Sequence, residues 1–194
     1  MRNSGGKATL RAEVTDGIVE AVLDELAEVG YGRLSMDGVA RRARAGKAAL
    51  YRRWSSKQDM VVDVVTGLSL PAAPVESSGY LVADVVDLVA GVNAWLGDPR
   101  FARILADLLA EAQRNPGLAD ALDQLGAARR RSGATVIAAA IERGEVRRDV
   151  DVEYAVDLMA GPIFWRICGL RRTTTPEFLD RVVDTVLHAL GAQR

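Results

Sequence analysis

The sequence of 194 residues predicts an all-α fold. Apolar residues recur at intervals of three and four along most of the chain, which is the spacing of one face of an α-helix. Residues that favour a helix start precede these segments, and Pro follows directly in Asp98-Pro99, Asn115-Pro116 and Thr175-Pro176. No segment shows the sustained apolar and polar alternation of a strand, so we expect helices throughout.

Composition and the termini narrow the class of protein. Hydrophobic residues make up 49% of the chain, which is enough for a buried core. The single Cys168 cannot form an internal disulfide, and the first residues lack the apolar core of a secretory signal. The most apolar stretch, residues 158–170, contains Arg166 and is shorter than the roughly 20 residues of a membrane span. We therefore expect a cytoplasmic protein with no membrane helix.

The first predicted domain covers residues 11–69 and follows a flexible tail over residues 1–10. A helix from about Arg11 ends at Gly30, and Ser35 caps a short second helix. Its apolar face carries Val14, Ile18, Val22, Leu26 and Val29. A third helix covers residues 47–54 with Leu50 and Trp54 on its inner face, and a fourth begins after Ser55 or Ser56.

The second predicted domain covers residues 80–194, after a linker over residues 70–79 that contains two prolines, two serines and a glycine. Gly126 and Gly133 are places where its longest helix can bend. Its predicted helices span residues 80–96, 99–114, 116–143, 151–167 and 176–190.

Positive charge is concentrated in residues 31–58, which hold eight basic residues and one acid, Asp37. The basic residues are Arg33, Arg41, Arg42, Arg44, Lys47, Arg52, Arg53 and Lys57, so this segment has a net charge of +7 in a chain of net charge −1. A solvated helix face is one explanation of such a run. Two short helices joined by a tight turn, with Lys, Arg and Tyr exposed on the second, favour a helix-turn-helix that enters the major groove of DNA.

Residues 18–43 and 47–60 closely resemble the DNA-binding domain of the TetR family of transcriptional regulators. The matching features are the Ala27 to Tyr31 segment, Ser35 at the start of the second helix, and Lys47, Leu50, Tyr51, Arg52 and Trp54 in the third. Residues 151–167 and 176–190 resemble a C-terminal domain common in that family. The resemblance implies an N-terminal helix-turn-helix domain followed by a helical ligand-binding and dimerisation domain, in a repressor of a double-stranded DNA operator.

The resemblance also implies roles for individual residues. Lys47 and Ala48 match positions near base edges. Tyr51 matches a position that contacts phosphate or base, and Arg53 matches one that contacts phosphate. Ser35 and Lys57 match helix starts that hold phosphates. The predicted DNA-binding residues are Ser35, Arg44, Gly46, Lys47, Ala48, Ala49, Tyr51, Arg52, Arg53 and Lys57.

The turn between the second and third helices departs from the family pattern of Gly, an apolar residue and Ser, because this chain has Arg44, Ala45 and Gly46. In the left-handed conformation Arg44 would cost roughly 1 kcal/mol or more. Gly46 is a weaker N-cap than Ser, and Ala49 stands where a polar residue is common.

A homodimer is predicted from the last two helices. Residues 152–170 are apolar on nearly every face, and such a helix must be covered by more than its own domain. The resemblance implies that these two helices pair with their copies. The predicted interface residues are Val156, Ile163, Ile167, Phe178, Val182 and Val186.

Two modes of control are compatible with the sequence. In one, a small apolar effector binds the C-terminal domain and releases DNA; in the other, that domain serves only dimerisation or a protein partner. The family favours the first mode. The predicted pocket residues are Trp95, Phe101, Leu105, Met159, Ile163 and Phe164, for which ordinary core packing is the alternative.

Catalysis and metal binding are not expected. The only His, His188, lies on a different predicted helix from Cys168, so no nucleophile and base are paired in sequence. One Cys and one His give no zinc-type ligand cluster, and there is no Gly-rich phosphate loop. We therefore predict neither an enzyme nor a cofactor.

Overall fold

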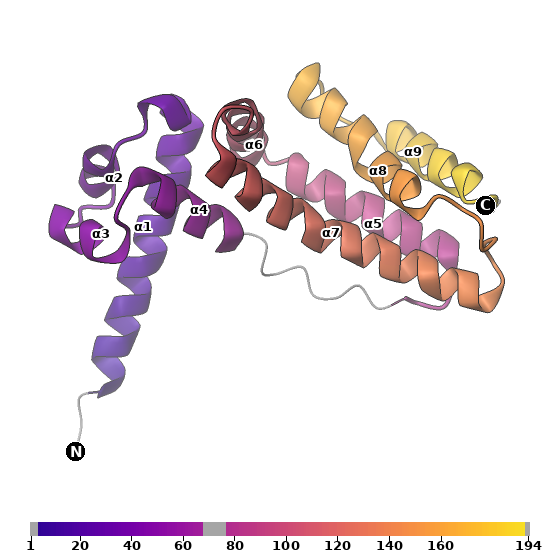
Figure 1. Cartoon of the computed structure of the whole chain (residues 1–194), viewed down its shortest axis with the longest axis horizontal. Coiled ribbons are helices and arrows are strands. Elements are labelled where there is room, and N and C mark those ends of the chain that lie inside the picture. The colour runs from indigo at the N-terminus through magenta and orange to yellow at the C-terminus, as the bar shows by residue number, and fades with distance from the viewer. Residues whose placement is uncertain (1–3, 68–76, 193–194) are drawn as a thin grey trace. The chain divides into compact units, whose positions relative to one another are not determined.

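The computed structural model describes residues 4–67 and 77–192, the side chains of residues 4–15 and 128 excepted, and its regular elements there are helical (Figure 1). The chain divides into two compact units, Met1–Leu68 with Arg103–Asp123 and Ser69–Ala102 with Gln124–Arg194. The predicted linker lies largely outside the described residues. The predicted domain boundaries and the predicted flexibility of residues 1–10 therefore stay predictions.

Helix α1 spans Ser4–Arg33 and begins earlier than the predicted start near Arg11. Residues 8–12 favour a helix and contain no Pro, so the sequence supplies no stop between Ser4 and Arg11. Gly30 has a φ of 75°, which breaks the helical geometry where the sequence predicted the end of the helix. Gly adopts this conformation without strain because it lacks a Cβ atom.

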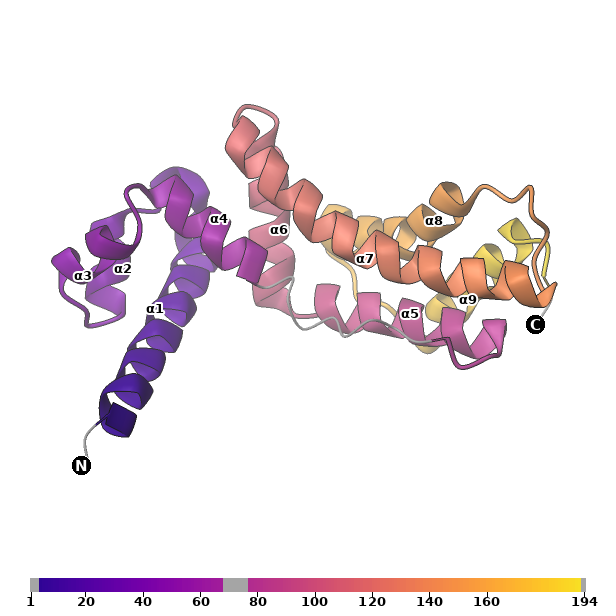
Figure 2. The same ribbon diagram turned by 60° about the horizontal axis from the view of Figure 1, so that its bottom comes forward.

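Three further helices complete the N-terminal part of the first unit, namely α2 (Met36–Arg42), α3 (Lys47–Arg53) and α4 (Lys57–Gly67). The Ser35 hydroxyl accepts a hydrogen bond from the Gly38 N–H at 3.1 Å, so the predicted cap of α2 is confirmed. The Ser56 hydroxyl accepts one from the Asp59 N–H at 3.0 Å and caps α4. Helix α1 packs against both α2 and α4, and α3 packs against α2 at the outer edge of this unit (Figure 2).

The remaining helices are α5 (Leu81–Leu96), α6 (Pro99–Ala112), α7 (Pro116–Arg143), α8 (Val152–Phe164) and α9 (Pro176–Ala189). Helix α7 continues through Gly126 and Gly133 without a break. A Cβ atom on Gly133 would lie 3.0 Å from the Val156 side chain, so Gly133 lets α8 approach α7 closely. The helix predicted over residues 151–167 turns into a π-helix, η1 (Trp165–Gly169), just after Pro162, which lacks a backbone N–H.

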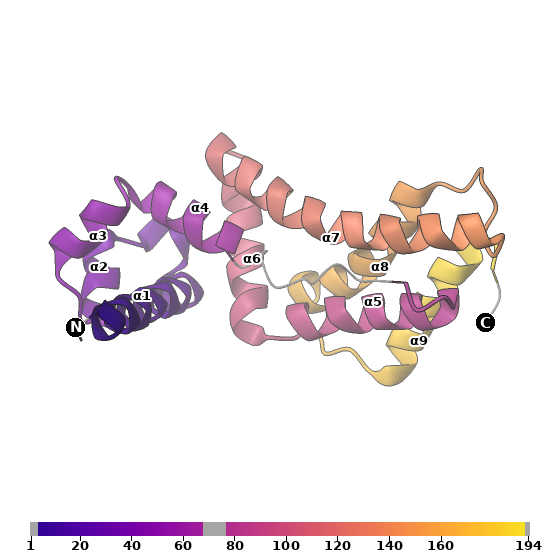
Figure 3. The same ribbon diagram turned by 90° about the horizontal axis from the view of Figure 1, so that it is seen from below.

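The core of the second unit lies among α5, α8 and α9, which contact one another pairwise. In Figure 3, α5 and the C-terminal half of α7 run along one another. The buried apolar side chains of these elements include Val85, Val89, Val136, Ile137, Met159, Ile163, Val182, Val186 and Leu187.

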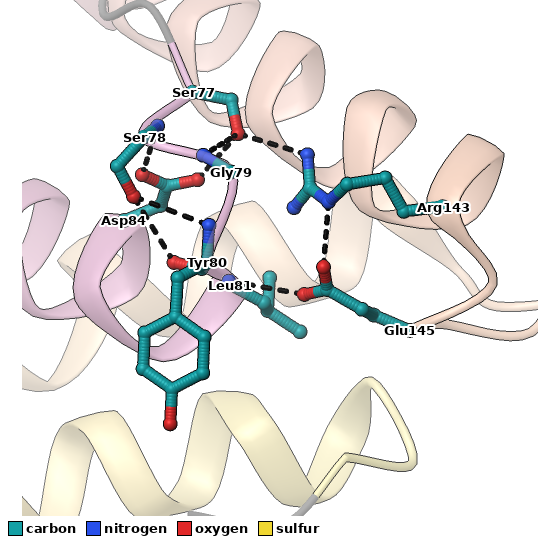
Figure 4. Close-up of polar contacts among 8 residues, drawn as sticks. All are labelled: Ser77, Ser78, Gly79, Tyr80, Leu81, Asp84, Arg143 and Glu145. Carbon is teal, nitrogen blue, oxygen red and sulfur yellow. Dashed lines mark hydrogen bonds and ion pairs between the residues drawn. The ribbon is translucent and has the colours of Figure 1, made fainter.

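Asp84 on α5 is the one buried charged side chain of the described residues, with 2% of its surface exposed. Its carboxylate accepts hydrogen bonds from the Ser77 hydroxyl at 2.6 Å and from the Ser78 N–H at 2.7 Å (Figure 4). Burial alone would raise the pKa of this carboxyl, but the hydrogen bonds from Ser77 and Ser78 outweigh it and the pKa is lowered.

The same cluster extends to the end of α7. Arg143 donates to the Ser77 hydroxyl at 3.0 Å and forms an ion pair with Glu145, whose carboxylate accepts the Leu81 N–H at 3.0 Å (Figure 4). The start of α5 and the end of α7 are therefore joined by polar groups that satisfy one another. Removing one acceptor would leave partly buried donors without partners.

We predict that Asp84→Asn lowers the free energy of unfolding by about 1–3 kcal/mol near neutral pH, because buried hydrogen bonds to a charged acceptor are lost. The folded-state pKa of Asp84 lies below the unfolded value of about 3.9, so its charge stabilises the wild type above about pH 4. This contribution disappears as the pH falls through the folded pKa. Urea unfolding at neutral and acid pH measures both effects.

The matched control is Asp87→Asn, because Asp87 is exposed on the same helix. It should change the free energy of unfolding by less than about 0.5 kcal/mol at either pH. A loss for Asp84→Asn that is equally large at acid pH would contradict the predicted role of the charge.

Candidate nucleic-acid interface

Helix α3 has one buried and one exposed face. Leu50 is fully buried and Trp54, directly after the helix, is almost so, which confirms the predicted inner face. Tyr51 is 55% exposed, and Ala48 and Arg52 are also exposed. Tyr51 therefore does not belong to the core, and the outer face of α3 presents an aromatic and a basic side chain to solvent.

The turn between α2 and α3 contains a residue in the left-handed conformation. Arg44 has a φ of 50°, and the Ala45 N–H donates to the Ala40 carbonyl at 3.0 Å. Gly46 stands at the N-cap of α3 without a side chain to cap it. The turn is thus closed by main-chain hydrogen bonds, and Arg44 is held with its side chain exposed.

Close packing fixes α2 on α1. A Cβ atom at Gly38 would lie 2.6 Å from the Glu25 carboxylate, so a larger residue here would require the Glu25 side chain to move. Arg42 of α2 pairs with Glu25 at 2.8 Å and also with Glu28, both on α1. Because α3 packs on α2, these contacts also set the position of the exposed face of α3.

Two of the predicted DNA-binding cations have carboxylate partners. Lys47 lies 2.6 Å from Asp37, and Arg53 lies 3.2 Å from Asp63, which also accepts the Trp54 indole N–H at 2.9 Å. Sequence reasoning missed both partners, although Asp37 is the one acid in residues 31–58. Exposed pairs of this kind contribute about 0–1 kcal/mol, so phosphates can compete with them.

Three arginines on α2, α3 and the turn have free charges. The guanidinium groups of Arg41, Arg44 and Arg52 are exposed and form no ion pair or hydrogen bond with the residues that the structure describes. Arg41 was not among the predicted site residues, although its position in the basic segment of residues 31–58 could have identified it as a DNA-binding candidate. These three cations extend the positive surface of α3.

The side chains of Lys57 and Ser35 form hydrogen bonds within the protein. The Lys57 ammonium donates to the Tyr31 carbonyl at 2.8 Å and lies 4.5 Å from the centre of the Tyr31 ring. The Ser35 hydroxyl accepts its capping bond from Gly38. Their phosphate contacts stay predictions, and for the Lys57 side chain such a contact requires breaking the bond to Tyr31.

The predicted pocket residues fall into both units. Trp95 and Phe101 lie together in the second unit, with ring centres 4.2 Å apart. Met159 and Ile163 are buried on α8, and Phe164 is half-buried. Leu105 is also buried but belongs to the first unit.

Four of the predicted interface residues are enclosed within a single chain: Val156, Ile163, Val182 and Val186. They have almost no surface to offer to a second copy. Ile167 and Phe178 are half-buried. The large apolar side chains exposed on and after α8 are Tyr154, Trp165 and Leu170, with Trp165 61% exposed.

The residues weighed for catalysis lie on separate elements. Burial raises the pKa of the Cys168 thiol in η1, whereas His188 is exposed on α9. Among the side chains that the structure describes, no three His, Cys, Asp or Glu gather as a metal site. Within residues 4–67 and 77–192, no helix has both the length and the apolar character needed to cross a bilayer.

Known proteins match both parts of the chain. Residues 18–64 match the family described as "Bacterial regulatory proteins, tetR family", and residues 75–186 match "Tetracyclin repressor-like, C-terminal domain". The HTH-type transcriptional regulator Mb1581 of Mycobacterium bovis is 31% identical over 172 residues, 88% of this chain and 84% of that protein.

Solved structures match along almost the whole chain. The TetR family transcription regulator SCO0332 has a TM-score of 0.66 and 30% identity, over 91% of this chain and 98% of the other. The transcriptional regulator FadR from Bacillus subtilis, solved in complex with stearoyl-CoA, has a TM-score of 0.70 at 15% identity, over 93% of this chain and all of the other.

We predict that replacing Lys47 and Tyr51 together by Ala abolishes binding to duplex DNA. Each lost base or phosphate contact costs about 1–3 kcal/mol, so the loss of two contacts should lower the affinity at least roughly thirtyfold. Gel retardation measures it, on a duplex that the wild-type protein selects from a randomised pool. Both side chains are exposed, so the melting temperature should stay near that of the wild type.

Leu50→Ala is the control for loss of binding through unfolding. Leu50 is fully buried, so its truncation should lower the free energy of unfolding by about 2–5 kcal/mol. Retardation by the Lys47 and Tyr51 double variant as strong as that by the wild type would show that the outer face of α3 does not contact DNA.

Proposed function

This chain belongs to the TetR family of transcriptional regulators, and from that premise we propose that it is a homodimeric repressor which a small, mostly apolar molecule releases from its operator. As a member of this family it is a non-enzymatic DNA-binding regulator. The proposal comprises the dimer, the operator, the repressor role, the effector and a place in the cytoplasm, where the operator would lie.

The exposed face of α3 is the observation that carries the proposal. Lys47, Ala48, Tyr51 and Arg52 line it, while Leu50 anchors the opposite face in the core. A short helix held this way can enter the major groove with its side chains on base edges. The free charges of Arg41, Arg44 and Arg52 suit the phosphates on either side.

Operator recognition by a dimer requires a surface that a second copy can cover. Tyr154, Leu158, Gly161 and Trp165 follow each other at helical spacing along α8 and into η1, and all are exposed or half-buried. We assign the dimer contact to this stripe together with α9, because Ile163 and Val186 are already enclosed. The family resemblance implies that pairing of the last two helices with their copies sets two copies of α3 about one DNA turn, roughly 34 Å, apart.

We predict that Trp165→Glu converts the dimer into monomers and weakens operator binding at the same time. The substitution puts a charge on the apolar stripe, and charge is disfavoured at the core of such interfaces. Sedimentation at micromolar concentration measures the association, and the circular dichroism of the variant should match that of the wild type because Trp165 is exposed.

Two control variants distinguish the loss of an exposed interface from damage to the core. Tyr80→Glu changes another exposed aromatic of the second unit, outside α8, and should leave the dimer intact. Ile163→Asp places a charge at a fully buried position, so it should unfold the chain and not only dissociate it. A Trp165→Glu variant that sediments as a dimer would remove α8 from the proposed interface.

An effector is supported by the family and by one relative in fold. FadR from Bacillus subtilis was solved with stearoyl-CoA, which shows that this fold accommodates a ligand with a long apolar tail. In this chain Pro162 and the π-helical turn of η1 interrupt the regular hydrogen bonds of α8. Such an interruption gives α8 a place to change shape when a ligand binds.

We predict that apolar compounds which raise the melting temperature also weaken operator binding. Ligand and operator must oppose each other reciprocally, because a molecule that binds both states equally shifts nothing. A thermal-shift screen of diverse apolar compounds finds the ligands, and fluorescence anisotropy of a labelled operator measures release. Stabilising compounds that leave operator affinity unchanged would favour a C-terminal domain used only for dimerisation or a protein partner.

A further inference from the structure

Arg129 lies on α7 against an aromatic pair of its own unit. Its guanidinium carbon is 3.8 Å from the centre of the Trp95 ring, and that ring is 4.2 Å from Phe101. Trp95 comes from the last turn of α5 and Phe101 from the first turn of α6. All three side chains are half-buried, so the cation is partly shielded from solvent by the aromatic pair.

The charge of Arg129 has no counter-ion among the described residues. Its guanidinium forms no ion pair and no hydrogen bond with any residue that the structure describes. Two other arginines of the same unit do form ion pairs, Arg143 with Glu145 and Arg147 with Asp149. Burial lowers the pKa of Arg129, which reflects the same loss of water without a compensating anion.

A half-buried guanidinium without an anion beside it has lost part of its hydration and has gained no opposite charge in return. The face of Trp95 recovers only part of the cost of removing the charge from water. Arg130 and Arg131, its neighbours in the same run of three arginines, are exposed and keep their hydration. Arg129 is therefore the member of the run whose five N–H donors are in place for a ligand that enters from outside the protein.

We propose that Arg129, Trp95 and Phe101 form the head-group end of the effector site and select a carboxylate on an apolar body. The planar guanidinium offers two parallel N–H donors, which match the two oxygens of a carboxylate. Trp95 and Phe101 supply the apolar surface on which the body of the ligand packs. This inference rests on the proposed function, because it specifies the chemistry of the effector named there.

The test compares acids with alcohols of the same body. Decanoate and decan-1-ol, and 2-naphthoate and 2-naphthol, are titrated into the full-length protein by calorimetry. We expect at least one acid to bind roughly tenfold or more tightly than its alcohol, and Arg129→Met to remove that preference. Arg129→Lys keeps the charge without the planar fork and should retain part of it.

Arg131→Met is the matched control, because Arg131 is exposed on the same helix, and it should bind the acids as the wild type does. The melting temperature and operator affinity of each variant without ligand establish that the fold is intact. The inference is overturned if no acid binds more tightly than its alcohol, if Arg129→Met keeps the preference, or if that substitution dissociates the dimer.

Operator release distinguishes this inference from the proposed function. An acid that binds through Arg129 but leaves the operator bound would support the carboxylate site and contradict the effector role. An alcohol that releases the operator as well as its acid does would support the effector role and overturn the carboxylate site.

Discussion

The first unit depends on the turn at Gly30 and Tyr31, where three segments of the chain meet. The Tyr31 N–H donates to the Asp107 carboxylate at 2.6 Å, and its carbonyl accepts from Lys57 at 2.8 Å. Its hydroxyl accepts a longer bond of 3.4 Å from Asn115. The positive φ of Gly30 turns these main-chain groups away from the helix ladder of α1 and toward their partners. The end of α1, the start of α4 and residues 103–123 are thereby fastened together.

This junction explains why Lys57 faces inward although it belongs to the basic run. The Lys57 ammonium donates to the Tyr31 carbonyl at the end of α1. A Lys side chain near a helix C-terminus commonly bonds the last carbonyls in this way. The cations left for phosphate are those on α2, α3 and the turn. A shift of residues 103–123 would act on Tyr31 first, and through α1 and α2 on α3.

Local signals in the sequence predicted much of the fold. The helix starts at Ser35 and Thr175, the break at Gly30 and the inner position of Leu50 each depend on a few neighbouring residues, and each is present. The burial of Ile163 and Val186 within a single chain could not be predicted from local signals. Apolar periodicity alone does not distinguish a residue of the chain's own core from one that contacts another copy. The partners of Lys47 and Arg53 depend on packing between helices, which spacing along one helix does not reveal.

Arginines without a partner among the described residues differ chemically between the two units. Arg41, Arg44 and Arg52 are exposed and have no partner among the described residues, so their charge costs little in the absence of DNA and acts through long-range attraction to a polyanion. Arg129 is free and half-buried, so its charge costs more until an anion of fitting shape arrives. Exposed cations are suited to the many phosphates of DNA, because they do not need to fit any one phosphate closely. A cation held against Trp95 is suited to one small anion, because only a ligand that also covers the aromatic surface can reach it with both oxygens.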